Sequence, residues 1–330
     1  MISSMKYRIL LLGCVALPLM AAVGGCGKTE ASRDGKAKLE KVRYAAFSGL
    51  NGVAIQMGVE KGFFRDAGIE VEFIDTKDPV SILASGEADF ADTNTGLAII
   101  AAGRGAPIKI VASVFRTRMP FCLIGSPAIR NIGDLRGKKV GIGAFGTGLE
   151  IFARTALARN GLKAEDVTLI ANGRHSQAFA SLESGQVDAT IISEPFVTLG
   201  EKTGKARLLA RGCDYLPDFH VGALTAGDAF IDKHPELLRK MIQVYFRSQE
   251  YAKGHPDEYL DYAQKLMKLD WDVLAAGLKR EAILWENRPD VSMAALNETQ
   301  KVQIAMGFQE KAYDLGKIVD LRFIPKTGAK

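Results

Sequence analysis

The sequence predicts an α/β protein with two lobes, and three observations support this fold class. From Lys41 to about residue 210, short apolar runs alternate with amphipathic stretches, as in β-α-β units that build a mostly parallel sheet. After about Phe230 the pattern becomes helical. About 300 residues remain once an N-terminal leader is set aside, enough for a large core divided between two lobes. We therefore expect one α/β core, a second α/β core and a helical return.

In the first half of the chain, apolar runs mark the strands, and glycine or proline marks helix ends. Gly62 and Gly103 follow two amphipathic stretches, and Pro79 stands at a favoured first-turn position. The expected strands are 42–47, 69–75, a brief strand at Phe90, and 108–115, and the expected helices are 53–61, 79–85 and 96–102.

The same signals continue through the second half. Gly161 is a suitable C-terminal cap for the helix before it. The expected strands are 121–124, 140–142, 167–170 and 190–192, and the expected helices are 149–160, 177–184, 235–253, 256–267, 271–284 and 293–315.

The N-terminus has the composition of a lipoprotein export signal. Lys6 and Arg8 precede an uncharged run over residues 9–23, and small residues lead to Cys26. A transmembrane helix is the alternative, but the run is shorter than the roughly 20 residues of a span and contains Pro18. We expect residues 1–25 to be the signal peptide, Cys26 to carry the lipid, and residues 26–40 to be a flexible leash.

Composition excludes one function class. Formal net charge is +5, and it falls to +3 without Lys6 and Arg8 of the leader. The basic residues are scattered, which argues against a nucleic-acid surface. Cys122 and Cys213 are the thiols of the folded part, and the sequence leaves open whether they form a disulfide.

A glycine-rich stretch follows the expected strand 140–142. Gly141, Gly143 and Gly146 have the spacing of a dinucleotide-binding motif, but the acidic Asp166 precedes the next strand instead of ending it, so we reject that interpretation. A strand that passes through glycines into a helix still presents free backbone N–H groups to an anion. Thr147 either adds a hydroxyl donor or caps the helix.

No catalytic or metal-binding constellation is present. The four histidines are far apart, and the sequence contains no Cys-x-x-Cys, His-Glu-x-x-His or Gly-x-Ser-x-Gly motif. We therefore expect no catalytic residues, no metal and no cofactor. An exported enzyme on the same scaffold remains the alternative of a different class.

Several segments resemble a family of bacterial solute-binding proteins for nitrate, sulfonates and taurine. The resemblance runs in order from about residue 42 to 210 and lies in GVEKGFFRDAGIEVEF (58–73), SGEADFAD (85–92), GRGAPIKIVA (103–112), DLRGKKVG (134–141), SGQVDAT (184–190) and SEPF (193–196).

This resemblance implies a type II periplasmic-binding-protein fold, with two parallel-sheet lobes, two crossover strands and solute bound between the lobes. The expected lobes are 41–116 with 220–330, and 117–219. It also implies an extracytoplasmic lipoprotein, in the periplasm or at the outer cell surface. The protein would be a monomer that delivers a small solute to the permease and ATPase subunits of an ABC importer.

Candidate solute contacts follow from a general rule. In open α/β sheets the ligand lies beyond the carboxyl ends of the strands. The candidates are Phe47, Ser48, Asn51, Asp92, Asn94, Thr95, Arg116, Gly146, Thr147 and Glu194. Each has a structural alternative: Asn51 and Asn94 as helix caps, Arg116 at the hinge surface, and Glu194 in a turn before Pro195.

The sequence leaves the solute open. Arg116 and the helix start at Thr147 suit a sulfonate, nitrate or carboxylate, whereas Glu194 suits an amine, and taurine carries both kinds of group. An aromatic vitamin precursor of the pyrimidine type is the other solute class that we consider, since Phe47, Phe115, Phe145 and Phe196 offer stacking surfaces.

Overall fold

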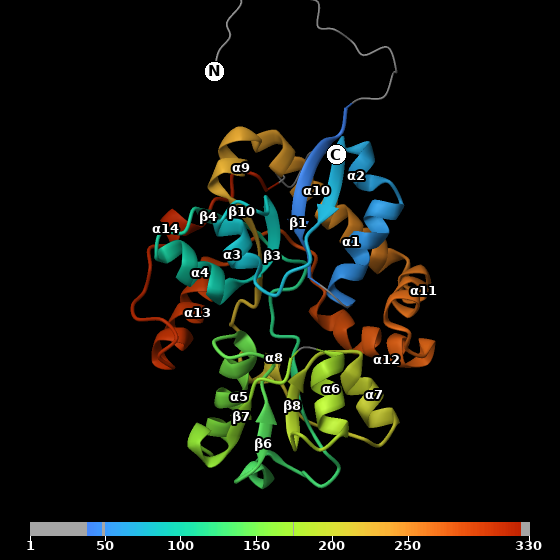
Figure 1. Ribbon diagram of the computed structural model, residues 1–330, viewed down its shortest axis with the longest axis vertical. Helices are drawn as coiled ribbons and strands as arrows, with labels where there is room; N and C mark the ends of the chain where they lie inside the picture. The colour runs from blue at the N-terminus through green and yellow to red at the C-terminus, as the bar shows by residue number, and fades with distance from the viewer. Residues whose placement is uncertain (1–37, 48–49, 174, 325–330) are drawn as a thin grey trace, which may run out of the picture. The chain divides into compact units, whose positions relative to one another are not determined.

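The computed structural model describes residues 38–47, 50–173 and 175–324. The expected signal peptide, Cys26 and most of the leash lie outside the described residues. The described chain forms two separate five-stranded sheets with helices around each (Figure 1). None of its helices combines the length and the apolar character that a membrane span requires.

The first sheet contains most of the N-terminal strands. Its strand order is β2-β1-β3-β10-β4. The strands are β1 (Glu40–Ala45), β2 (Ile69–Phe73), β3 (Phe90–Asn94), β4 (Ile108–Ser113) and β10 (Gly222–Gly227). β1 is parallel to β2 and β3, whereas β10 is antiparallel to both of its neighbours, β3 and β4.

Helices from both ends of the chain cover this sheet. They are α1 (Leu50–Glu60), α2 (Phe63–Asp66), α3 (Pro79–Ala84), α4 (Thr95–Gly103), α9 (Asp228–Lys233), α10 (Pro235–Gly254), α11 (Pro256–Met267), α12 (Trp271–Glu281), α13 (Met293–Ala305) and α14 (Leu315–Ile318). Tyr44 and Val53 pack with Tyr245 in one apolar cluster, and Ile99 packs with Leu296 in another. The C-terminal helices therefore complete the core that the N-terminal strands begin.

The second sheet has the order β7-β6-β8-β5-β9. Its strands are β5 (Cys122–Gly125), β6 (Lys139–Gly141), β7 (Thr168–Ile170), β8 (Ala189–Ile192) and β9 (Arg207–Arg211), and its helices are α5 (Gly148–Arg159), α6 (Ser176–Glu183), α7 (Phe196–Lys202) and α8 (Gly212–Tyr215). Leu123 packs with Phe152 of α5, whereas the next residue, Ile124, packs with Phe179 of α6. This alternation buries both faces of the sheet.

The expectation of two parallel sheets needs one correction, because both sheets are mixed. β5 is antiparallel to β8 and β9, just as β10 is antiparallel in the first sheet. β5 and β10 are the first strands that the chain forms after it passes from one sheet to the other. A parallel neighbour requires a long crossover connection, usually a helix, between the two strands. The connections from β4 to β5 and from β9 to β10 contain no such long helix.

The other differences from the expected elements are local. Two strands, β9 and β10, and the short helices α2, α7, α8, α9 and α14 were not predicted. The helix expected over 293–315 ends at Ala305, just before Gly307, whose φ is +76°. α12 follows β10 in the chain, yet it packs against α7 beside the second sheet. The lobe boundaries of the sequence analysis stay a prediction.

Candidate functional site

A buried carboxyl group fixes the end of β1. The Phe47 N–H donates to Oδ2 of Asp92 (2.7 Å), and the Tyr44 hydroxyl donates to Oδ1 (2.8 Å). Asp92 is 1 % exposed, and burial raises its pKa to about 7. A Cβ on Gly52 would overlap the Phe47 carbonyl oxygen, so Phe47 lies close against the first turn of α1. Ser48 lies outside the described residues.

The helix that follows β3 begins beside a helix of the second sheet. Asn94 is the N-cap of α4, and its Oδ1 accepts the Leu97 N–H (3.2 Å), so its expected capping role is present. Its Nδ2 faces Gly148, the first residue of α5, where an added Cβ would lie 3.4 Å away. The N-terminal ends of α4 and α5 therefore meet, although they belong to different sheets.

Thr95 is turned away from solvent into a buried polar network. Its Oγ1 lies 2.9 Å from Nδ1 of His220, whose Nε2 lies 3.0 Å from Oγ of Ser113. His220 is 1 % exposed, and burial lowers its pKa to about 4, so the imidazole is neutral at physiological pH. Sequence reasoning missed His220, because its partners lie more than a hundred residues away.

Two hydrogen-bond donors of the glycine-rich loop before α5 already have partners in the loop or in α5. Gly146 has a φ of +75°, and its N–H donates to Oε2 of Glu150 (2.8 Å), a 2 % exposed residue that also pairs with Arg154. The Thr147 hydroxyl donates to the Ala144 carbonyl (2.8 Å). The Gly146 N–H thus already has an anionic partner, and an incoming anion would meet the first-turn amides of α5 instead.

Asn172, two residues after the end of β7, supports this loop. Its Oδ1 accepts the Gly143 N–H (3.0 Å), and its Nδ2 donates to Ser181 (2.8 Å) and Thr190 (2.9 Å). A Cβ on Gly141 would overlap the Asn172 amide. Glycine at position 141 is therefore required by packing, and the motif spacing in the sequence did not reveal this role.

Arg116 and Asn51 contact each other in the interior. Arg116 is 3 % exposed, its Nη2 donates to Oδ1 of Asn51, and its Nη1 lies 2.8 Å from Oε2 of Glu281. Burial raises the pKa of Glu281, and the Arg116 guanidinium partly offsets this effect. Both predicted solute contacts are thus occupied by protein groups, and Arg116 is not at the surface.

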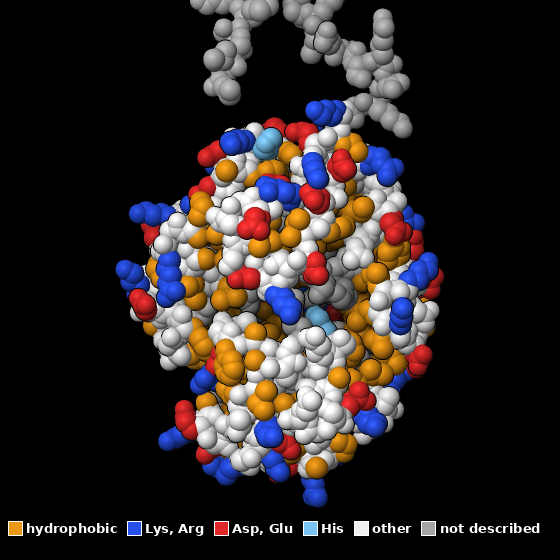
Figure 2. All heavy atoms as spheres, in the orientation of Figure 1, with side chains coloured by type: hydrophobic (Ala, Val, Ile, Leu, Met, Phe, Trp, Pro, Cys, Tyr) orange, Lys and Arg blue, Asp and Glu red, His pale blue; other side chains and the backbone are white. Residues whose placement is uncertain are grey.

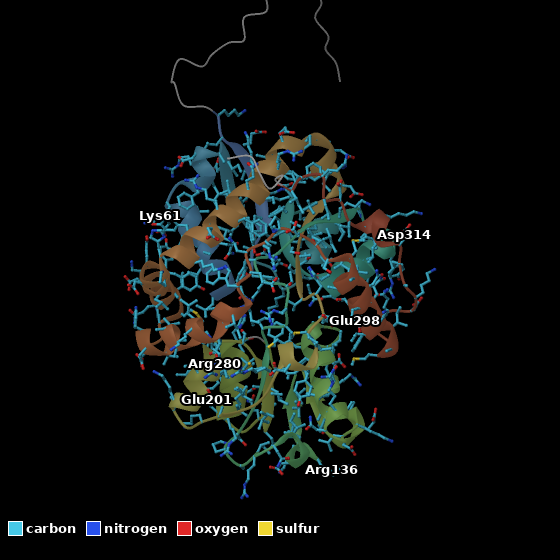
Figure 3. All side chains as sticks on the ribbon, turned by 180° about the vertical axis from the view of Figure 1, so that it is seen from behind. Lys61, Arg136, Glu201, Arg280, Glu298 and Asp314 are labelled. Atoms are coloured by element: carbon cyan, nitrogen blue, oxygen red, sulfur yellow. The ribbon has the colours of Figure 1, made fainter. Side chains whose placement is uncertain are left out.

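Glu194 is turned toward α12. It is 4 % exposed, its Oε2 accepts the Thr198 N–H (3.0 Å), and its Oε1 lies 3.0 Å from Nη1 of Arg280. Figure 3 shows Arg280 beside Glu201, with which it forms a second ion pair. The expected turn is present at Glu194 and Pro195, and the peptide bond between them is cis.

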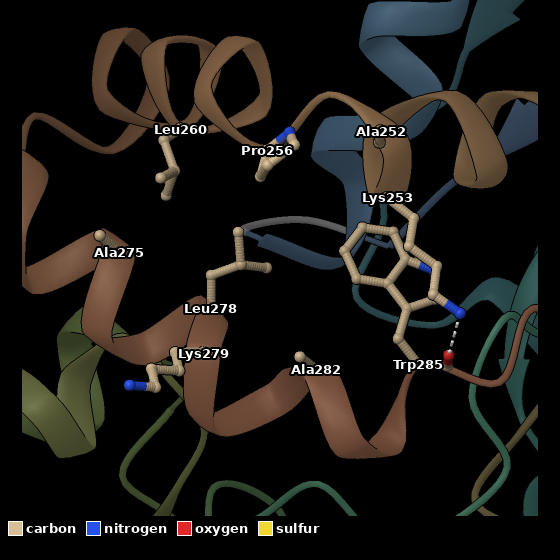
Figure 4. Close-up of a pocket in the computed structure, with 9 residues that line it drawn as sticks. All are labelled: Ala252, Lys253, Pro256, Leu260, Ala275, Leu278, Lys279, Ala282 and Trp285. Atoms are coloured by element: carbon tan, nitrogen blue, oxygen red, sulfur yellow. Dashed lines mark hydrogen bonds between the residues drawn. The ribbon is translucent and has the colours of Figure 1, made fainter.

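Of the predicted residues, Phe47 and Asn94 lie at the ends of β1 and β3, and Gly146 and Thr147 lie directly before α5. Figure 2 shows a hollow near the middle of one face, between the ends of β1 and β3 above and α6 below. A separate cavity of about 290 Å³ lies between α10, α11 and α12 (Figure 4). Its walls are mostly apolar, Lys253 at its edge donates to the Trp285 carbonyl (3.0 Å), and no predicted solute contact lines it.

Metal-ligating side chains and thiols are the other groups that could give the protein a reactive site. Within residues 38–47, 50–173 and 175–324, no cluster of His, Cys, Asp and Glu is arranged to hold a metal ion. Cys122 and Cys213 are both free thiols, and burial raises the pKa of each.

Comparison with known proteins places the chain among binding proteins. The family model described as NMT1/THI5 like matches residues 51–259. A Bacillus subtilis protein named for the binding of aliphatic sulfonates is 28 % identical over 95 % of each chain. The taurine-binding periplasmic protein of Escherichia coli is 22 % identical over 63 % of this chain and 65 % of its own. A formylaminopyrimidine-binding protein of Halalkalibacterium halodurans is 25 % identical over 63 % and 64 %.

Solved structures share the fold. The alkanesulfonate-binding protein SsuA from Xanthomonas axonopodis, bound to MOPS, superimposes with a TM-score of 0.70 at 17 % identity over 85 % of this chain and 98 % of its own. The desulfurization enzyme DSZB superimposes with a TM-score of 0.66 at 16 % identity over 86 % and 97 %. These similarities confirm the predicted periplasmic-binding-protein fold, but binding proteins and an enzyme share it, so the fold alone does not decide between them.

Proposed function

Because the chain belongs to the NMT1/THI5-like family, we propose that it is the solute-binding component of an ABC importer, with a small organic sulfonate or taurine as its solute. One observation carries the choice of an anion. Asn94 at the start of α4 faces Gly148 at the start of α5, so two helix N-termini from different sheets point toward one place. The first-turn amides of α5 and the positive ends of the two helix dipoles favour a sulfonate there.

The proposal assigns contacts to both sides of the cleft. Phe47, Ser48 and Asn94 would contact the solute from the first sheet, and Thr147 and the first amides of α5 from the second. A solute that touches both sides favours the closed arrangement, whereas one that touches a single side shifts no hinge equilibrium. Asn51, Thr95, Arg116 and Glu194 would support the site from behind, through the protein contacts described above.

We propose further that the mature chain is a monomer anchored outside the cytoplasm through a lipid on Cys26. There it would deliver the solute to the permease and ATPase subunits of the importer. The near-neutral charge of the folded part and the polar segment after Cys26 support a soluble domain on a leash.

A thermal-shift screen of the mature chain tests the solute class. The screen contains ethanesulfonate, taurine, nitrate and formylaminopyrimidine, and a solute at 100 times its Kd stabilises by about 2.7 kcal/mol. We expect stabilisation by ethanesulfonate or taurine. Stabilisation by formylaminopyrimidine alone would favour the vitamin-precursor class of the Halalkalibacterium relative.

The enzyme alternative needs its own measurement, since DSZB has the same fold. The mature chain incubated with organic sulfonates and sulfinates should release neither sulfite nor sulfate. Multiple-turnover release of either product would contradict the proposed role.

A further inference from the structure

Asp92 is a buried acid without a cationic partner. It is 1 % exposed, and among the described residues it forms no ion pair. Its two oxygens accept one hydrogen bond each, from the Phe47 N–H and the Tyr44 hydroxyl. An ionised carboxylate in such surroundings is costly, so its presence at this position calls for an explanation.

The groups that face Asp92 do not titrate near neutral pH. They are the phenols of Tyr44 on β1 and Tyr245 on α10, and burial raises the pKa of both well above the ordinary value. The Arg116 guanidinium acts on Tyr245 in the opposite direction but forms its own ion pair with Glu281. Burial raises the pKa of Asp92 to about 7, so among these facing groups it is this carboxyl that changes charge in that range.

Phe47 connects Asp92 to the proposed solute site. The Phe47 N–H is bound to Asp92, and the Phe47 carbonyl lies against Gly52 in the first turn of α1. The Phe47 N–H is therefore held by Asp92, and the Phe47 carbonyl leaves no room for a side chain at position 52. A change at Asp92 would act on the Phe47 peptide without any contact between Asp92 and the solute.

We propose that Asp92 is a positioning residue, whose carboxylate holds the Phe47 peptide in the binding conformation and whose protonation releases it, so that solute affinity falls as pH falls. This inference rests on the proposed function. A hydrogen bond to a carboxylate is roughly twice as strong as one to a neutral acceptor. A Phe47 peptide held less firmly must be ordered when the solute binds, and that ordering lowers the affinity.

Ethanesulfonate is the probe for calorimetric titration, because a sulfonate stays ionised across the whole range. We compare the mature wild-type chain, Asp92→Asn and Tyr44→Phe at about pH 5.5 and about pH 8. The wild type should bind about three- to tenfold more weakly at the lower pH. Tyr44→Phe removes the other donor to Asp92 and should keep this difference, whereas Asp92→Asn should abolish it.

A second measurement needs no solute. In the ligand-free chain, the backbone amide resonance of Phe47 should shift with a midpoint near pH 7 in the wild type. The midpoint should be higher in Tyr44→Phe, which lacks the hydroxyl that lowers the Asp92 pKa, and Asp92→Asn should show no such shift. An amide resonance that does not move, or a wild-type affinity equal at both pH values, would overturn the inference. If ethanesulfonate fails to bind at either pH, the proposed sulfonate class is wrong. The Phe47 resonance then still decides whether Asp92 holds the Phe47 peptide.

Discussion

The Arg280 guanidinium joins Glu194 to Glu201, with Nη1 3.0 Å from the first carboxylate and Nη2 2.7 Å from the second. The next residue, Glu281, pairs with Arg116. α12 therefore contacts the turn after β8 through Arg280 and the segment after β4 through Glu281. Glu194 and Arg116, which the sequence marks as solute contacts, thus each form an ion pair with α12, and their contact with a solute stays a prediction.

Glu194→Gln distinguishes a structural ion pair with Arg280 from a contact with the solute. The change removes the charge that faces Arg280 in a buried position, and we expect a loss of about 1–3 kcal/mol in the free energy of unfolding. The lower part of the range applies because the Arg280 side chain is 29 % exposed and partly screened by solvent. Urea unfolding measures the loss, and solute affinity should change little.

Glu201→Gln is the matched control, since it removes the other carboxylate from the same guanidinium. The Glu201 side chain is 35 % exposed, so its ion pair should contribute less than about 1 kcal/mol. If Glu194→Gln instead leaves stability unchanged and abolishes binding of an amine-bearing solute such as taurine, Glu194 contacts the solute.

The sequence predicted the alternating elements because strand and helix periods are local properties. It also placed Asn94 after the brief strand at Phe90, and Asn94 is the last residue of β3. Contact of Asn94 and of the start of α5 with a solute stays a prediction from sheet topology. It did not reveal that Arg116 pairs with Glu281, or that His220 joins Thr95 to Ser113. Such pairs are set by tertiary packing between distant segments, and residue spacing carries no signal for them.

Gly148→Ala tests the place where α4 and α5 meet. An added Cβ would lie in ordinary contact, 3.4 Å from the Asn94 amide and 3.6 Å from Met119, so the fold should tolerate it. Alanine in place of a helical glycine stabilises by up to about 1 kcal/mol. The methyl group occupies space between the two helix starts, so affinity for ethanesulfonate should fall by about fivefold or more while thermal stability stays equal or rises.

Gly254→Ala is the control for this change, because an added Cβ at the end of α10 meets no atom within 4 Å. It should leave affinity unchanged. Unaltered binding in Gly148→Ala as well would show that the solute does not lie between α4 and α5.

Cys26→Ser tests the lipid anchor. Serine has no thiol to acylate, so the full-length chain should either leave the membrane fraction or retain its unprocessed leader. Cys14→Ser is the control, since Cys14 lies within the expected signal peptide and should not matter. Cell fractionation and the mass of the N-terminal fragment measure the outcome. Normal processing and membrane retention of Cys26→Ser would refute the anchor.

Asp92 should also make the stability of the ligand-free chain depend on pH. Its folded pKa of about 7 lies above the ordinary aspartate value of about 3.9, so the folded state binds the proton more tightly than the unfolded state. Its contribution to stability is therefore fully present below about pH 4, is lost as pH rises toward about 7, and stays lost at higher pH. Asp92→Asn removes this dependence, because an amide does not titrate.

The free energy of unfolding of Asp92→Asn relative to wild type should accordingly rise by up to about 1.4 kcal/mol per pH unit between about pH 4 and about pH 7, and then level off. Urea unfolding at several pH values measures this difference, and Tyr44→Phe, which keeps the carboxyl, should retain the wild-type trend. A difference that is constant with pH would mean that the Asp92 pKa is not raised. A difference that rises with pH would mean that the Asp92 carboxylate, which holds Phe47, makes the wild-type chain less stable at neutral pH. A destabilising group of this kind is expected where it is retained for binding.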